Sequence, residues 1–132
     1  MKKKLEINII TPTDTFNYSE VEYLRAPSIE GLFGVLPGHI SSIIALDVGE
    51  IKIISNNKSM YFAISGGFAD INKDKVILVL ETAEESSHID TKRAEKSLDR
   101  AKKYLRDKSH DVNRTLDSIK RAKNRILISK KN

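Results

Sequence analysis

The sequence predicts an α+β protein, with an N-terminal β-sandwich or flattened barrel and a C-terminal antiparallel pair of helices. Two changes near residue 88 support this division. Residues 1–88 carry 8 Lys and Arg against 12 Asp and Glu, whereas residues 89–132 carry 15 against 6. The spacing of apolar residues changes there too, from the period of two typical of strands to the helical period of about three and a half. We therefore expect a sheet domain at residues 1–86 and a basic helical hairpin at residues 87–132.

Short alternating or apolar segments predict the strands of the first domain. Residues 5–9 alternate apolar and polar side chains and end at Thr11 and Pro12, as expected for a half-buried strand that meets a turn. Segments rich in Gly, Asn, Asp and Ser, which favour turns, separate the later strands. Short strands at such even spacing are typical of a sandwich or barrel. The further predicted strands are residues 21–26, 42–46, 51–54, 61–64 and 76–80.

Two apolar stripes at helical spacing predict the hairpin. Residues 107–111 are polar, so they separate the two helices and offer caps for the second one. The seam between the helices would be thin, because several of its side chains are alanines. We therefore expect the hairpin to depend on the sheet domain, a ligand or a partner for its stability. The stripes are Ala94, Leu98, Ala101 and Leu105, then Val112, Leu116, Ile119 and Ile126.

The composition argues against most catalytic chemistry. The chain has no Cys, which excludes disulfides, thiolate zinc sites and a cysteine nucleophile. His39, His88 and His110 are far apart, and none belongs to a pair with metal-ligand spacing. No Gly-x-x-x-x-Gly-Lys-Ser/Thr loop or obvious carboxylate pair for magnesium is present, so phosphoryl transfer lacks its usual groups. We predict a non-catalytic protein with no metal site and no required cofactor.

The sequence also bears on the membrane. The basic start at residues 1–4 is followed by Glu6, Asn8 and Thr11, which interrupt the apolar stretch that a signal peptide needs. We therefore expect a cytoplasmic N-terminus. No segment approaches the roughly 20 apolar residues that span a bilayer, so membrane association is expected only through a partner or at the surface.

Three motifs carry a resemblance to a known family. Residues 31–39 read Gly-Leu-Phe-Gly-Val-Leu-Pro-Gly-His, residues 64–68 read Ile-Ser-Gly-Gly-Phe, and residues 89–94 read Ile-Asp-Thr-Lys-Arg-Ala. In order and spacing they resemble the epsilon subunit of bacterial F-type ATP synthase, over nearly the whole chain. The resemblance implies a ten-stranded β-sandwich followed by two helices. It also implies a rotor subunit of the central stalk that couples the gamma subunit to the ring of c subunits.

The glycine-rich residues 31–39 have two readings. From the residues alone, a tight connection that displays apolar side chains either covers its own core or forms a partner surface. The resemblance implies contact with gamma and the c ring. Many relatives have an acidic residue where this chain has Leu32, so apolar packing would replace an ion pair there. His39 lacks an orienting carboxylate nearby, and we expect it to bond to backbone. The implied contact residues are Leu32, Phe33, Val35, Leu36 and His39.

Residues 89–94 also have two readings. Asp90 suits the N-cap of the first helix, with Ile89 as a hydrophobic staple before it. The resemblance instead implies an ATP site in which arginine side chains bind the triphosphate, while Glu84 and Asp90 accept from the adenine amino group. ATP would then be a regulatory ligand and not a substrate. The implied ATP-binding residues are Glu84, Ile89, Asp90, Arg93, Ala94, Arg100, Arg121 and Arg125.

The basic tail leaves a second class of function open. Its cations would attract nucleic acid, so a basic helical nucleic-acid-binding module on a β domain is the alternative. Base stacking needs aromatic side chains, and Tyr104 is the tail's one aromatic residue. The resemblance favours protein partners. It implies contacts of the helices with the alpha and beta subunits, regulation of ATP hydrolysis, and a peripheral location on the cytoplasmic face of the cell membrane, reached through the complex.

Overall fold

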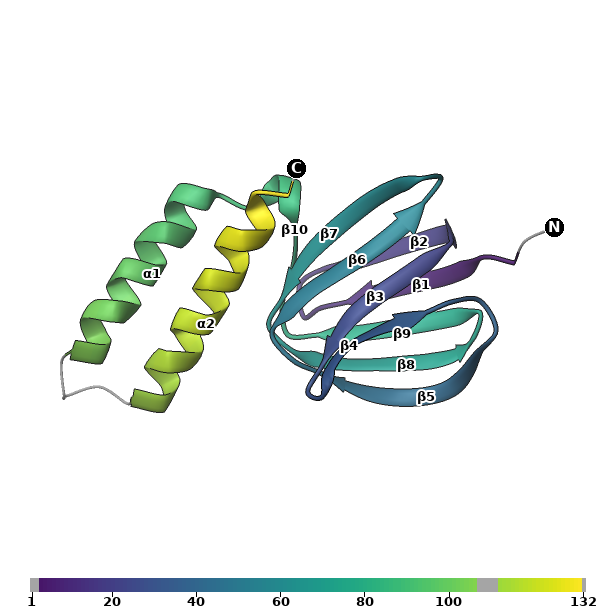
Figure 1. Ribbon diagram of the computed structural model, residues 1–132, viewed down its shortest axis with the longest axis horizontal. Helices are drawn as coiled ribbons and strands as arrows, with labels where there is room; N and C mark the ends of the chain where they lie inside the picture. The colour runs from purple at the N-terminus through teal and green to yellow at the C-terminus, as the bar shows by residue number, and fades with distance from the viewer. Residues whose placement is uncertain (1–2, 107–111, 132) are drawn as a thin grey trace.

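The computed structural model of the chain describes residues 3–106 and 112–131. Within these residues, ten strands form a sandwich and two α-helices follow it (Figure 1). The predicted fold class is therefore confirmed. The strands are β1 (Leu5–Ile10), β2 (Thr15–Val21), β3 (Tyr23–Ser28), β4 (Gly31–Val35), β5 (His39–Leu46), β6 (Gly49–Ser55), β7 (Lys58–Ile64), β8 (Gly67–Lys73), β9 (Lys75–Leu80) and β10 (Ala83–Glu85).

One continuous sheet makes both layers of the sandwich. Its strand order is β10-β7-β6-β3-β5-β8-β9-β1-β2, with β4 paired to β3. The β1–β9 pair is parallel, and the other pairs are antiparallel. The sheet folds over between β3 and β5, which share the single pair Ser28 and Leu46. Phe16 and Tyr18 of β2 then lie 6.1 and 6.0 Å, centroid to centroid, from the ring of Phe62 on β7.

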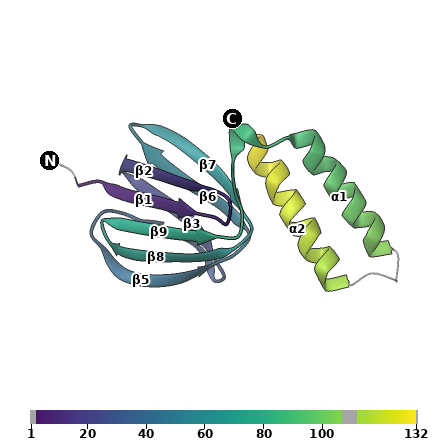
Figure 2. The same cartoon turned by 180° about the vertical axis from the view of Figure 1, so that it is seen from behind.

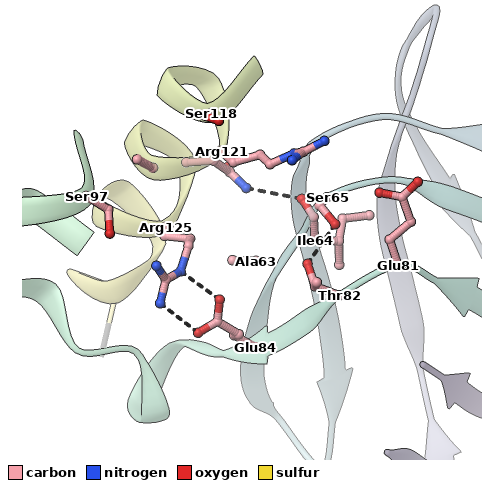
Figure 3. Close-up of a pocket in the computed structure, with 12 residues that line it drawn as sticks. Ala63, Ile64, Ser65, Glu81, Thr82, Glu84, Ser97, Ser118, Arg121 and Arg125 are labelled. Atoms are coloured by element: carbon pink, nitrogen blue, oxygen red, sulfur yellow. Dashed lines mark hydrogen bonds and ion pairs between the residues drawn. The ribbon is translucent and has the colours of Figure 1, made fainter. Parts of the chain in front are cut away.

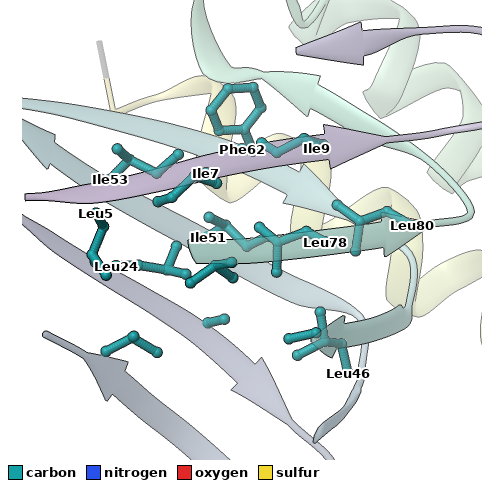
Figure 4. Close-up of a cluster of buried hydrophobic side chains, with 14 of the residues drawn as sticks. Leu5, Ile7, Ile9, Leu24, Leu46, Ile51, Ile53, Phe62, Leu78 and Leu80 are labelled. Carbon is teal, nitrogen blue, oxygen red and sulfur yellow. The ribbon is translucent and has the colours of Figure 1, made fainter. Parts of the chain in front are cut away.

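The main core lies wholly within the sandwich. Its members are side chains that the alternation of each strand turns inward (Figure 4). They come from residues 5–80, so the helices add nothing to this cluster. Burial of a core leucine, isoleucine or phenylalanine contributes roughly 1.5–3 kcal/mol. The largest are Leu5, Ile7, Ile9, Leu24, Ile51, Ile53, Phe62, Ile71 and Leu78.

Four strands were not predicted: β2, β4, β8 and the three-residue β10. The edge strand β2 is largely polar, and its side chains are mostly exposed. We expected a connection at residues 31–39, but residues 31–35 form β4 beside β3. Gly66 and Gly67 looked like a turn, yet Gly67 begins β8 and pairs with Leu46 and Leu80.

The predicted helical hairpin is confirmed. Its helices are α1 (Thr91–Arg106) and α2 (Val112–Ser129), preceded by a short 3₁₀ helix, η1 (Ser86–His88). The two α-helices run antiparallel, and α2 lies between α1 and the sandwich (Figures 1 and 2). Neither described helix is long and apolar enough to cross a membrane. The caps predicted for the second helix, in residues 107–111, lie outside the described residues.

The first apolar stripe is correct, and the second is partly wrong. Ala94 and Ala101 of α1 are buried. On α2, however, Val112 and Leu116 are 52% and 48% exposed. The buried face of α2 is rotated about the helix axis, by about one residue relative to the predicted stripe, because α2 must pack against both α1 and the sandwich. It consists of Thr115, Ile119, Ala122 and Ile128.

Gly67 provides a test of the fold. Its φ is +145°, and a Cβ there would lie 2.0 Å from the carbonyl oxygen of Val79. Backbone strain and this clash together should cost at least about 3 kcal/mol in Gly67→Ala. Gly31 is the matched control, since its φ of +129° carries similar strain but a Cβ would meet nothing within 4 Å. Chemical denaturation should show the larger loss for Gly67→Ala, and equal losses would contradict the close approach of β9.

Candidate functional site

A pocket lies where the helical hairpin meets the sandwich (Figure 3). Its volume is about 330 Å³, near the lower end of the range for small-molecule sites. Strand β7, the β9–β10 connection and both α-helices contribute side chains, so the pocket exists only while α2 is docked. It is lined by Ala63, Ile64, Ser65, Glu81, Thr82, Glu84, Ser97, Ser118, Arg121, Ala122, Asn124 and Arg125.

An ion pair between Glu84 and Arg125 lies at one side of this pocket. Glu84 is on β10, which is held in place by pairing with Ala63 of β7. Arg125 Nε lies 2.6 Å from Glu84 Oε1, and the Arg125 terminal nitrogen donates to Glu84 Oε2 at 3.0 Å. The terminal nitrogen makes the hydrogen bond, whereas Nε is buried and lies close to the carboxylate without a hydrogen-bond partner. The pair ties α2 to the sheet and is visible in Figure 3.

Arg121 lies one helical turn before Arg125 and faces the same pocket. It is exposed and makes no ion pair within the described residues. In Figure 3 its guanidinium extends toward Ser65, whose hydroxyl lies 2.7 Å from that of Thr82. The pocket thus combines an unpaired cation, a paired cation and hydroxyl groups, which suits an anionic ligand.

The arginines of α1 do not line the pocket. Ser97 does, while Arg93 and Arg100 are exposed. Their spacing of four and three residues from Ser97 places them on the same stripe of α1, next to the pocket. The structure therefore brings together Glu84, Arg121 and Arg125 of the predicted ATP-binding residues, and leaves Arg93 and Arg100 outside the pocket lining.

The other residues of the motif have structural contacts. Asp90 Oδ1 accepts from the backbone N–H of Arg93 at 3.1 Å, so the predicted N-cap is confirmed. Ile89 is buried in a small cluster with Ala63 and Ile128. Ala94 is fully buried. None of Ile89, Asp90 and Ala94 lines the pocket.

Polar contacts hold α2 on the sandwich. Lys120 Nζ lies 3.2 Å from Asp47 Oδ2, and the Asn124 side-chain amide donates to the Gly49 carbonyl at 2.8 Å. Lys131 beyond α2 pairs with Glu50. Sequence reasoning found none of these contacts, because they join residues far apart in the chain.

Glu50 and Asp47 are tied to the sandwich as well as to α2. Arg25 of β3 donates to Glu50 Oε1 at 2.6 Å, so Glu50 lies between two cations. The backbone N–H of Val48, with some help from Lys120, holds the pKa of the Asp47 carboxyl below its usual value, against the opposing effect of burial. Each acid therefore has a place fixed by the sheet, from which it can bind a lysine of the tail.

Burial, and to a lesser extent the charge of Glu85, raises the pKa of Tyr18.

No group of three or more His, Cys, Asp or Glu suited to a metal ion occurs among the described residues.

Residues 31–39 present a second candidate site, a partner surface. Leu32 and Leu36 are 64% and 61% exposed. Phe33 packs partly against the core, and Val35 is fully buried, so the expected partner contact through the Val35 side chain is wrong. Val35 faces inward because β4 pairs with β3.

Strand β5 and the β3–β4 turn carry further exposed residues that sequence reasoning missed. His39 Nδ1 lies 2.7 Å from the Ile40 carbonyl, so the expected backbone bond of this histidine is confirmed. Ile29, Ile40 and Ile43 are 72%, 81% and 77% exposed. Three exposed isoleucines, one in the β3–β4 turn and two on β5, together with Leu32 and Leu36 are an unusual amount of exposed apolar area for a small domain.

Comparison with known proteins decides the family. The model of the family described as ATP synthase, Delta/Epsilon chain, beta-sandwich domain matches residues 4–86. The chain belongs to the ATP synthase epsilon family. It is 36% identical to the ATP synthase epsilon chain of Bacillus cytotoxicus, over 96% of this chain and 97% of that one. It is 41% identical to the epsilon chain of Nitratidesulfovibrio vulgaris, over 80% and 78%.

Solved structures share the fold of this epsilon-family chain. A chain of the Euglena gracilis mitochondrial ATP synthase superposes with a TM-score of 0.81 at 22% identity, covering 94% of this chain and 80% of that one. A chain of the Tetrahymena thermophila mitochondrial ATP synthase, described as central stalk and c ring, gives 0.61 at 18% identity, covering 99% and 98%.

The lowered pKa of Asp47 gives a pH test of the contacts of its carboxylate with Val48 and Lys120. A folded-state pKa below the unfolded value of about 3.9 means that the charged form stabilises the fold above that pH, and that this stability is lost as the pH falls through the lowered pKa. Asp47→Asn should therefore lower the Tm at pH 7, by about 1 kcal/mol or less in stability, and the difference from wild type should shrink at pH 3. Asp70→Asn, on an exposed side chain of β8, is the control. A difference independent of pH would contradict the charge-based contact.

Proposed function

We propose that this epsilon chain is a non-catalytic subunit of the ATP synthase central stalk, whose sandwich couples gamma to the c ring. The observation that carries the proposal is the exposed apolar surface of Ile29, Leu32, Leu36, Ile40 and Ile43 on a sandwich with its own complete core. A rigid body with such a surface can transmit torque between two partners. The complex would hold the chain on the cytoplasmic face of the cell membrane.

The pocket between the sandwich and the hairpin is proposed to bind ATP as a regulatory ligand. Arg121 and Arg125 lie at i and i+4 and both line the pocket, so they can contact phosphate oxygens together. Arg93 and Arg100 stand beside it on α1 and would join on a modest movement of that helix. The Ser65 and Thr82 hydroxyls offer neutral hydrogen bonds to the same ligand.

The helices are proposed to regulate ATP hydrolysis by leaving the sandwich. Docking rests on ion pairs and on the hydrogen bond of the Asn124 side-chain amide, with Ile128 as the main apolar contact. It is therefore weak enough to be reversible. A ligand bound between α2 and β10 favours the docked state by its differential affinity, about 2.7 kcal/mol at a hundredfold excess over its Kd. ATP depletion would release the helices toward gamma, alpha and beta, where they would inhibit hydrolysis.

Arg121→Ala tests the ligand site. Loss of a charge-assisted bond should weaken ATP binding by roughly tenfold or more in calorimetry on the isolated chain, because Arg121 is the unpaired cation of the pocket. Stability should change by under about 0.5 kcal/mol, since the side chain is exposed. Lys123→Ala removes a charge from the same helix outside the pocket and should leave affinity within about twofold. Equal losses in both variants would argue against a specific site.

Deletion of residues 89–132 tests the regulatory role. The core of residues 5–80 remains intact, so the truncated chain should still assemble. ATP hydrolysis by the assembled enzyme at low ATP should rise, because the inhibitory segment is gone, while proton-driven synthesis is largely retained. A hydrolysis rate equal to that of the full-length enzyme would leave the coupling role of the sandwich and remove the inhibitory role of the helices.

A further inference from the structure

We infer that Glu84 is an internal competitor for the ligand, which occupies the Arg125 fork until a phosphate-bearing anion displaces it. The inference rests on the proposed anion site and adds how that site is controlled. In this role the negative charge of Glu84 opposes ligand binding, because it occupies the hydrogen-bond donor of Arg125 that the ligand needs.

The geometry of the pair supports this role. Both Glu84 oxygens lie close to Arg125. One is 2.6 Å from the buried Nε, and the other accepts a hydrogen bond at 3.0 Å from the terminal nitrogen, a group that a phosphate would also use. The side chains are 36% and 27% exposed, so a ligand can reach the pair from the pocket. A phosphate that accepts from this terminal nitrogen in the same way must take the place of the carboxylate, so binding there requires that Glu84 move away.

The two arginines of the pocket differ in just this respect. Arg121 is exposed and makes no ion pair within the described residues, so it can attract an anion without losing a partner. Arg125 must exchange one anion for another. An anion would therefore meet Arg121 first, and the strength of the Glu84–Arg125 pair would set the concentration at which the second contact forms.

The pair is also a docking contact between β10 and α2. A ligand that displaces Glu84 removes this contact and must replace it by bridging the two elements itself. A polyphosphate offers several anionic groups to the two arginines and the sheet, whereas a monophosphate offers one. Ligands of increasing length should thus differ in their effect on docking as well as in affinity.

The competitor role and an adenine-binding role for Glu84 have different consequences. Inorganic tripolyphosphate has no base. If Glu84 only accepts a hydrogen bond from adenine, a change at Glu84 should leave the affinity for tripolyphosphate unaltered. If Glu84 competes for Arg125, the same change should raise that affinity. Glu84→Gln removes the charge but keeps a carbonyl oxygen that could still accept from an amino group, so this variant separates the two roles.

The test is calorimetric titration of the full chain with tripolyphosphate and with ATP. Glu84→Gln should bind tripolyphosphate about fivefold more tightly than wild type, the upper range for a partly exposed ion pair. Glu81→Gln is the matched control: Glu81 lines the same pocket, and its side chain makes no ion pair within the described residues. Its affinity should change by less than about twofold.

The outcomes separate this inference from the proposed function. Unchanged or weaker tripolyphosphate binding by Glu84→Gln, or an equal gain in Glu81→Gln, would overturn the competitor role. Failure of ATP to bind wild type, together with tight tripolyphosphate binding by Glu84→Gln, would support the competitor and overturn ATP sensing by the natural chain. Absence of tripolyphosphate binding in both proteins would overturn the anion site and the competitor together.

A second measurement covers loss of docking in the variant. The side-chain amide resonance of Asn124, which bonds to Gly49, reports whether α2 remains on the sandwich. If that resonance shows undocking, the carboxyl carbon resonances of wild type decide. Tripolyphosphate should shift the resonance of Glu84 more than that of Glu81, and equal shifts would overturn the inference.

Discussion

Helix α2 has to contact two different partners, α1 on one side and the sandwich on the other, and the arrangement of the whole C-terminal half depends on this. A single helix has room for one broad apolar face. In α2 the buried positions include Thr115 and Ala122, so apolar area is limited. The contact with the sandwich is completed by Lys120, Asn124 and Arg125. The main core of the sandwich contains no helix residue, whereas the position of the helices depends on solvent-accessible polar bonds that salt weakens.

The sheet could be predicted where burial follows from alternation, and not where it depends on neighbours. Residues 5–9 and 76–80 alternate or are uniformly apolar because each lies in a strand with a partner strand on both sides. The edge strand β2 needs few apolar residues, since one of its sides has no partner strand. Gly67 suggested a turn. In the structure it has a positive φ and no side chain, so the Val79 carbonyl oxygen can lie only 2.0 Å from where a Cβ would be. That close approach is a property of the folded sheet and has no local signal.

The candidate site divides in the same way. Asp90 was recognisable as a cap because a cap is a contact between residues three apart. The pair of Glu84 and Arg125 joins residues 41 apart, and that of Asp47 and Lys120 joins residues 73 apart. Neither spacing has a period or a turn to reveal it. Resemblance to a family identified Glu84 and Arg125 as site residues, but it gave no indication that they bind each other.

The opposite charges of the two halves acquire a physical meaning from these contacts. Acids of the sandwich, among them Asp47, Glu50 and Glu84, bind cations of α2 and its end, so the charge division seen in the sequence is also a complementarity between docked surfaces. Such pairs set register and speed association more than they add affinity. A partner that takes the helices away from the sandwich must therefore supply acidic groups of its own to the same cations. Partly exposed pairs of this kind favour quick docking in one register and add little to the strength of the contact.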